Sequence, residues 1–188
     1  MKTTSVAGRT WHYSHALGRE TAEHNGKIGG FGHPVDLAIS ADRTIFVLSR
    51  GYGFDPGDFG KDIFMRIGKT TIDEEHIGDF ARQEFIWPTG IDLSADGRLF
   101  VTDEFRHQVV IFPSDVIYPS PDFNPEGERI GEWGERGSAP GQLEAPSGIV
   151  FDSNDDIYIV DTGNNRVQKF SKDGEFQKSW GAAGTGDG

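Results

Sequence analysis

The chain has 188 residues, of which 35% are hydrophobic and 12% aromatic, enough for the core of one domain of ordinary size. Thirty acidic and 18 basic residues give a formal net charge of −12, which disfavours binding to a nucleic-acid backbone or an anionic membrane surface. Because no cysteine is present, disulfides and thiolate metal sites are excluded, whereas neutral ligands, cationic partners and metals bound through oxygen or nitrogen remain open.

The first 29 residues precede the repeated part of the chain. They lack the apolar stretch of a secretory signal, and no run in the chain approaches the ~20 apolar residues that span a bilayer. We therefore expect a cytoplasmic protein without a membrane segment. Within these residues, the aromatic-rich stretch at about 10–17 (TWHYSHAL) predicts one β-strand.

Three sequence repeats follow within residues 30–188. Each repeat starts near a proline, which is followed by a short strand, a polar turn and a second strand rich in β-branched and aromatic residues. A third strand comes next, and a fourth strand ends on an aromatic residue. The repeats occupy residues 30–80, 85–133 and 141–181, and the last residues of the chain are similar to the linker that precedes the third repeat.

The third repeat shows this pattern in full. Its strands are expected at residues 148–151, 157–160, 167–170 and 176–180, with turns of Asp, Asn, Ser and Gly between them. Four short antiparallel strands joined by tight turns form a meander, and repetition of such a unit is typical of a β-propeller. The sequence therefore predicts an all-β fold of about three four-stranded antiparallel blades.

The chain resembles the NHL-repeat family of β-propellers over residues 30–188, and most closely in the third repeat. The matching residues there are Pro146, Gly148, Ile149, Ile157, Tyr158, Ile159, Val160, Asp161, Asn165, Arg166, Val167, Phe170, Asp173, Gly174, Trp180 and Gly181. The second repeat differs at two turn positions, where His107 and Gln108 replace the asparagine and the arginine. The first repeat has Ser49 in place of the aspartate. The resemblance implies a propeller of six blades.

Three blades do not close a ring, because closed propellers have typically about 4–8 blades. The strand expected at residues 10–17 is surplus, since each repeat already has four strands, and it is suited to complete a last blade in the ring. We therefore expect the chain to be the N-terminal half of a six-bladed propeller. The alternative is that two copies complete the ring as a two-fold dimer, so that the partner is either a missing half or a second copy.

Candidate ligand-binding residues lie in turns and at the starts of the innermost strands, which face the central channel of a propeller ring. His33 precedes the first proline, and residues 51–60 form an insertion whose aromatic side chains either anchor a partner or pack against one another. An aspartate and an arginine that flank a turn are more simply explained by an ion pair within the blade or by a brace of the turn. The candidates are His33, Asp36, Tyr52, Phe54, Phe59, Asp103, Arg106, His107, Asp161 and Arg166.

Resemblance to propeller enzymes implies a second class of function. The amidating lyases among NHL propellers, and gluconolactonase-like propellers, bind a divalent metal through residues that directly follow the prolines. Here Val35, Thr89 and Ser147 occupy those positions, so the implied ligands are missing from this part of a ring. His33 and Asp103 remain as candidate ligands for a divalent ion such as calcium or zinc.

The sequence thus favours a scaffold that binds a protein or a small molecule, with no complete catalytic set. The alternative is a metal-dependent lyase or lactonase-like hydrolase whose ligands lie partly in absent blades. RNA binding, which some NHL domains carry out on a basic face, is a third class, and the net charge of −12 disfavours it.

Overall fold

The computed structural model describes residues 3–6, 9–12, 22–24, 27–29, 31, 33–51, 65–73, 76–82, 84–115, 129–182 and 184, with side chains from residue 31 onward except at residue 76. Two short hairpins come first, formed by β1 (Thr3–Val6) with β2 (Arg9–His12) and by β3 (Ala22–His24) with β4 (Lys27–Gly29). The strand expected at residues 10–17 overlaps β2, and residues 13–17 lie outside the described residues. Its role in closing a ring stays a prediction. Across the described ranges, no helix has the length and hydrophobicity to cross a bilayer.

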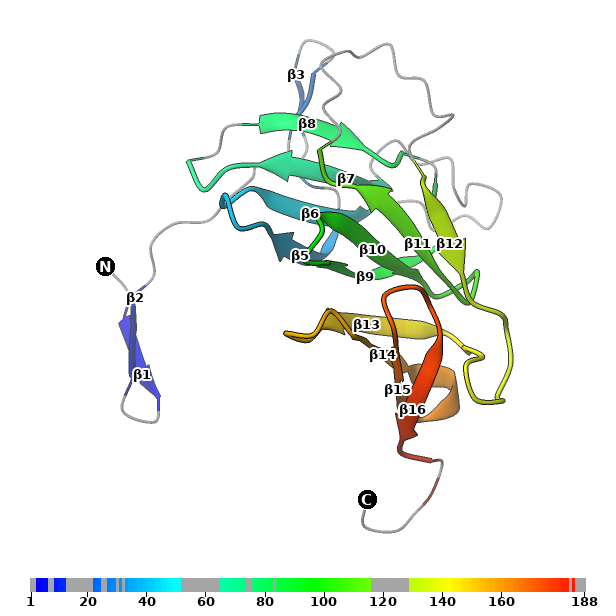
Figure 1. Ribbon diagram of the computed structural model, residues 1–188. Helices are drawn as coiled ribbons and strands as arrows, with labels where there is room; N and C mark the ends of the chain where they lie inside the picture. Colours follow the sequence, from blue (N-terminus) through cyan, green and yellow to red (C-terminus); the bar gives the residue numbers. More distant parts are fainter. Residues whose placement is uncertain are drawn as a thin grey trace.

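Three four-stranded antiparallel sheets follow, each a simple meander (Figure 1). Blade one contains β5 (Pro34–Ile39), β6 (Ile45–Arg50), β7 (Met65–Thr70) and β8 (His76–Phe80). Blade two contains β9 (Pro88–Leu93), β10 (Arg98–Asp103), β11 (Gln108–Pro113) and β12 (Gly131–Trp133). Blade three contains β13 (Pro146–Phe151), β14 (Ile157–Asp161), β15 (Arg166–Phe170) and β16 (Phe176–Trp180), with a 3-10 turn at Thr162–Asn164. The predicted all-β fold of three four-stranded blades is confirmed.

The blades follow one another with their first strands side by side, because β5 contacts β9 and β9 contacts β13 (Figure 1). Hydrogen bonds cross both junctions between these strands. Asp36 Oδ2 accepts a bond from the amide of Ile91 at 3.0 Å, and Asp92 Oδ2 accepts one from the amide of Phe151 at 2.7 Å. The first strands therefore form the inner side of the blade stack, as in a propeller.

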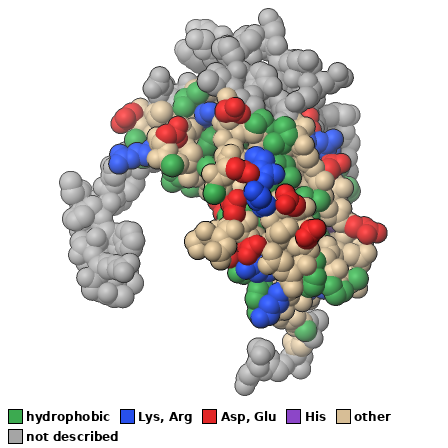
Figure 2. Space-filling view, in the orientation of Figure 1, with side chains coloured by type: hydrophobic (Ala, Val, Ile, Leu, Met, Phe, Trp, Pro, Cys, Tyr) green, Lys and Arg blue, Asp and Glu red, His purple; other side chains and the backbone are tan. Residues whose placement is uncertain are grey.

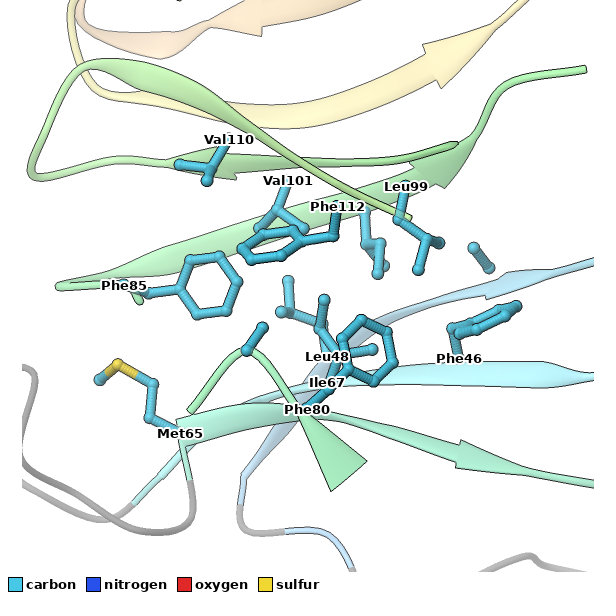
Figure 3. Close-up of a cluster of buried hydrophobic side chains, with 13 residues drawn as sticks. Phe46, Leu48, Met65, Ile67, Phe80, Phe85, Leu99, Val101, Val110 and Phe112 are labelled. Carbon is cyan, nitrogen blue, oxygen red and sulfur yellow. The ribbon is translucent and has the colours of Figure 1, made fainter. Parts of the chain in front are cut away.

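A hydrophobic core fills each junction between blades, and Figure 3 shows the first one. Blade one contributes Phe46, Leu48, Ile67 and Phe80 to it, and blade two contributes Leu99, Val101, Val110 and Phe112. Successive side chains of a strand point to opposite faces, so Phe100 of β10 enters the second core instead. There it meets Ile149, Ile157, Ile159 and Phe170 of blade three. Blade two is thus apolar on both faces because each face is covered by a neighbour.

The turns between first and second strands repeat one backbone geometry. Arg43, Gly97 and Asp155 occupy the same turn position, and all have left-handed φ values of 67°, 83° and 66°. Glycine and aspartate tolerate this region better than most residues, which explains why the turns of the sequence are rich in them. The turn before the third strand behaves likewise, with His107 at φ 57° and Asn165 at φ 55°.

Candidate functional site

One end of the blades carries most of the predicted site residues. We call it the proline face: first strands begin there at Pro34, Pro88 and Pro146, and second strands end there. It includes the residues that precede these prolines and the turns at 103–107 and 161–165. Antiparallel pairing brings these segments together, since Asp103 pairs with Pro88 and Asp161 pairs with Pro146.

In blade three, the buried side chain of Asp161 stabilises the proline face through hydrogen bonds. Its side chain is fully buried, and Oδ2 accepts hydrogen bonds from Arg166 Nε at 2.7 Å, Asn164 Nδ2 at 2.9 Å and Gln168 Nε2 at 3.0 Å. Oδ1 accepts a bond from the amide of Glu144 at 2.7 Å. The arginine is the strongest partner because both groups are charged. Asp161 and Arg166 thus form the ion pair within the blade that was the simpler interpretation of the sequence.

Arg166 also holds the linker between blades two and three. Its terminal nitrogens donate to the carbonyl oxygens of Ser138, Ala139 and Gln142 at 2.8–2.9 Å. Three backbone carbonyls and one carboxylate therefore surround a single guanidinium. This arrangement fixes the linker over the turn of blade three.

Asp103 has the equivalent position in blade two but different partners. Its buried carboxylate accepts hydrogen bonds from the amides of Ile86, Trp87, Phe105 and Arg106 at 2.7–3.2 Å. Arg106 Nε lies 3.9 Å from Oδ2, a looser contact than that of Arg166, and its terminal nitrogen donates to the Glu84 carbonyl. The oxygens of Asp103, a candidate metal ligand, are thus occupied by main-chain donors.

In blade one, the ion pair lies at a different position from those of blades two and three. Ser49 stands at the aspartate position, where its buried hydroxyl has no hydrogen-bond partner among the described residues. The arginine opposite, Arg66, is 1% exposed and pairs with Asp79 of β8 at 2.9 Å. Asp79 also contacts Arg82 at 3.1 Å. The turn between the second and third strands is therefore stabilised by different contacts in each of the three blades. This difference explains why the sequence repeat is less regular at this turn.

A pocket of about 590 Å³ opens on the proline face between blades two and three. It is lined by Trp87, Glu104, Phe105, His107, Arg136 and Ala145. The Phe105 side chain is 59% exposed although it is large and apolar. The size lies within the range of ligand pockets, roughly 300–1,000 Å³, and aromatic walls are common in such sites. These residues form the candidate binding site.

His107 presents a fixed hydrogen-bond donor to this pocket. Its Nδ1 accepts a bond from the amide of Ala145 at 3.0 Å. In the neutral imidazole the proton is therefore on Nε2, because a ring nitrogen that accepts a hydrogen bond carries none. No described residue of the protein accepts a bond from Nε2. The pocket thus contains one donor that is oriented but unused.

The charges around the pocket differ in how well they are paired. Arg136 makes two hydrogen bonds of 3.1 Å to Glu144, which raise the pKa of the guanidinium and lower the pKa of the carboxyl group. Glu104 has no ion pair within the described part of the chain. The nearby Arg50 lies over the Trp87 ring at 4.6 Å, and its burial lowers its pKa, an effect that the charge of Glu104 opposes. Among the described residues, the carboxylate of Glu104 without an ion pair therefore lines the same pocket as the unused donor of His107.

The other predicted site residues lie apart from this pocket. His33 is exposed at the start of blade one, where its carbonyl accepts the amide of Arg50 at 3.0 Å, and Asp36 joins the first two blades. Tyr52, Phe54 and Phe59 lie outside the described residues. No group of three or more potential metal ligands is found among the residues that are described.

Sequence reasoning found one residue of the pocket, His107, and missed the others. Two of those missed, Trp87 and Ala145, directly precede a proline, as His33 does. The position directly before a proline, which singled out His33, therefore also predicts Trp87 and Ala145. The remaining three are Glu104, Phe105 and Arg136, and only the packing of the linker onto the turn of blade two identifies them.

Comparison with known proteins agrees with this architecture. The family model "NHL repeat" matches residues 143–170. Similar curated proteins are "Protein brain tumor" of Drosophila melanogaster, 39% identical over 56 residues, and "NHL repeat-containing protein 3" of Homo sapiens, 36% identical over 56 residues. "B-box type zinc finger protein ncl-1" of Caenorhabditis elegans is 31% identical over 107 residues. These matches cover 30%, 29% and 52% of this chain but only 5%, 16% and 11% of the relatives.

Solved structures show the same fold at low sequence identity. A candidate gluconolactonase superposes with a TM-score of 0.56 and 17% identity over 82% of this chain and 49% of its own. The hydrazine synthase of Kuenenia stuttgartiensis gives a TM-score of 0.53 and 16% identity over 79% of this chain and 36% of its own. At these identities the likeness concerns the fold alone. Blade three thus matches the NHL repeat, and the three four-stranded blades have the fold of part of a β-propeller.

Proposed function

We propose that this chain is a binding module that takes up an extended protein segment in the pocket between blades two and three. The observation that carries the proposal is the exposed Phe105 ring beside the unused Nε2–H of His107 and the unpaired carboxylate of Glu104. Such a combination of apolar surface and oriented polar groups is typical of recognition sites.

A peptide segment suits these groups because every residue of an extended chain offers one carbonyl and one amide. The carbonyl is the acceptor that His107 Nε2–H lacks, and the amide is a donor for Glu104. An apolar side chain between them covers Phe105 and the edge of the pocket at Trp87. Aromatic residues of this kind contribute most of the binding energy at many interfaces.

Nucleic acid is the less suitable ligand for this face. Arginines at or near the pocket already have internal partners: Arg136 binds Glu144, Arg50 donates to the Pro88 carbonyl, and Arg166 binds Asp161 and the linker. Figure 2 shows acidic and basic side chains interspersed over the face in view rather than separated. A phosphate track needs a run of available cations, which a chain of net charge −12 does not favour.

A metal-dependent lyase or lactonase-like hydrolase remains the alternative. Thr89, at one of the implied ligand positions, uses its hydroxyl within the junction between blades, 3.1 Å from Thr102 Oγ1 and 3.0 Å from the Pro146 carbonyl. This alternative therefore depends on ligands outside the described residues. Stoichiometric binding of zinc or calcium by the chain, measured by calorimetry, would favour it over the binding module.

The proposal is tested by selecting peptides from a random displayed library on the immobilised chain. The dissociation constant of a selected peptide is then measured by fluorescence anisotropy for the wild type and for Phe105→Ala. Ile130→Ala is the matched control, because Ile130 is similarly exposed at 54% but does not line the pocket. We expect Phe105→Ala to weaken binding by about tenfold or more and the control to leave it unchanged. Equal binding to all three proteins would contradict the proposal.

A further inference from the structure

The pocket between blades two and three contains one carboxylate whose charge is not balanced by an ion pair. Glu104 lies in the turn at 103–107, and its amide donates to the Trp87 carbonyl at 2.9 Å, which fixes the turn against the residue before Pro88. Its side chain is half-buried in the pocket wall. Within the part of the chain that the structure describes, no basic side chain forms an ion pair with it. A carboxylate that is partly removed from water is stabilised when a cation lies beside it.

Two arginines of the same region have other partners. Arg136 lines the pocket, where its Nε and one terminal nitrogen each donate to Glu144 at 3.1 Å. Arg106 belongs to the same turn as the unbalanced carboxylate, but its terminal nitrogen donates to the Glu84 carbonyl at 2.9 Å. Neither guanidinium therefore neutralises the carboxylate that the pocket presents.

Arg50 shows that the aromatic wall of the pocket accepts a cation. Its guanidinium carbon lies 4.6 Å from the centre of the Trp87 ring, and its Nε donates to the Pro88 carbonyl at 3.2 Å. It interacts with Glu104 through charge but forms no ion pair with it among the described contacts. An aromatic face and a cation attract each other because the ring carries negative charge density above its plane.

The groups that the pocket leaves exposed are those that bind a guanidinium elsewhere on the proline face. Arg166 is bound by one carboxylate and three main-chain carbonyls, and Arg50 by one ring and one carbonyl. The pocket offers the carboxylate of Glu104 next to the Phe105 ring, which is 59% exposed. A planar guanidinium suits this pair of groups, since it stacks on aromatic rings and donates two parallel hydrogen bonds to a carboxylate.

We propose that the segment bound in this pocket carries an arginine, whose guanidinium pairs with Glu104 and stacks on Phe105. This inference rests on the proposed function and names the side chain that the site selects. A carboxylate has two oxygens and accepts several hydrogen bonds, so Glu104 receives the guanidinium and a main-chain amide of the segment together. Lysine is less suitable, because its ammonium group is compact, strongly hydrated and unable to stack.

An acidic segment is the opposite possibility, because arginines also lie in this region. It suits the pocket less well, since two nitrogens of Arg136 already bind Glu144 and an anion would lie near the charge of Glu104. The net charge of −12 acts in the same direction, because it attracts basic segments over long distances and repels acidic ones.

The experiment starts from peptides selected on the immobilised chain from a random displayed library. Each arginine of the tightest peptide is replaced in turn by citrulline, which has nearly the same shape but no charge, and by lysine. Dissociation constants are measured by fluorescence anisotropy for the wild type, Glu104→Gln and Glu135→Gln. Glu135 is the matched control, because it is an exposed acid of the linker that does not line the pocket.

We expect one arginine to recur in the selected peptides, and its replacement by citrulline to weaken binding to the wild type about tenfold. Glu104→Gln is expected to weaken the arginine peptide by a similar factor. In that variant, citrulline should cost less than about twofold, because the partner of the positive charge is already lost. Glu135→Gln should retain the full effect of citrulline.

The results separate this inference from the function on which it rests. The arginine is contradicted while the binding module stands if Phe105→Ala weakens the selected peptides but they lack arginine, contain acidic residues instead, or bind equally well with lysine. An equal effect of citrulline on the wild type and on Glu104→Gln would likewise overturn it. Failure to select any peptide, or peptides that bind Phe105→Ala as tightly as the wild type, would overturn both.

Discussion

Arg166 Nε donates a hydrogen bond of 2.7 Å to the buried carboxylate of Asp161, and the same guanidinium holds three carbonyls of the linker between blades two and three. One side chain thus joins a turn of blade three to the segment that forms a wall of the pocket. The corresponding contact of blade two, between Arg106 and Asp103, is 3.9 Å long. Because the contact of Arg166 is much shorter, we expect its loss to lower the free energy of unfolding more than the loss of Arg106 does.

Arg166→Met is expected to lower the free energy of unfolding by about 3 kcal/mol, because a buried carboxylate then loses its cationic partner. Arg106→Met is the matched control. It is expected to cost less than about 1 kcal/mol, since four amides continue to bind the carboxylate of Asp103. Urea unfolding of both variants measures the two values, and equal losses would show that the two arginines stabilise the protein to the same extent.

The turns and blades could be predicted from the sequence because their causes are local. Gly97, Asp155 and Asn165 mark left-handed turn positions, and residues of these types are the ones that tolerate such φ values. Alternation of side chains along a strand then assigns each apolar residue to one face. The turn residues, the alternation of side chains along strands and the threefold repetition of this pattern together predict the fold.

Gly174→Ala changes a contact through which blade three packs on blade two. The new methyl group meets the Trp133 ring, and φ at this position is 83°, so we expect a loss of about 2–3 kcal/mol in unfolding free energy. Gly97→Ala has the same φ of 83° but its methyl group meets only the Ser114 hydroxyl at 3.3 Å. Its loss is expected to be about 1 kcal/mol, from backbone strain alone. Chemical denaturation compares the two, and identical losses would mean that Trp133 does not restrict the turn.

Acid is expected to weaken a surface contact of blade two. Hydrogen bonds from Arg98 and Ser94 hold the pKa of Asp96 well below its ordinary value of 3.8. A carboxyl group whose pKa is lowered by folding stabilises the protein above its unfolded pKa, and this contribution is lost as the pH falls through the folded pKa. Asp96→Asn should therefore reduce stability at pH 7 by about 0.5 kcal/mol, a small value because the side chain is 43% exposed.

The measurement for Asp96 is urea unfolding at pH 7, 5 and 3. We expect the deficit of Asp96→Asn to be the same at pH 7 and 5 and to shrink at pH 3. Asp115→Asn is the control, since Asp115 is exposed and forms no ion pair within the described residues. A stability deficit of Asp96→Asn that grows toward low pH would contradict the expected pH dependence.

The pocket could be predicted only in part, because its residues come from different blades and from the linker. His107 stood out by its place in a turn, whereas Arg136 reaches the site only because Arg166 and Asp161 fix the linker. Such a juxtaposition depends on long-range contacts that a single sequence does not show. The loss of the aspartate at Ser49 was visible in the sequence, but the transfer of the ion pair to Arg66 and Asp79 was not.

The central claim is that the pocket between blades two and three binds a protein segment through Phe105 and the Nε2–H of His107. It is tested most directly by the affinity of a library-selected peptide for His107→Asn, because asparagine is present at the equivalent left-handed position, Asn165, and lacks the imidazole donor. We predict binding about tenfold weaker than to the wild type, at unchanged stability, with Ile130→Ala binding normally. A peptide that binds His107→Asn and Phe105→Ala as tightly as the wild type would contradict the claim.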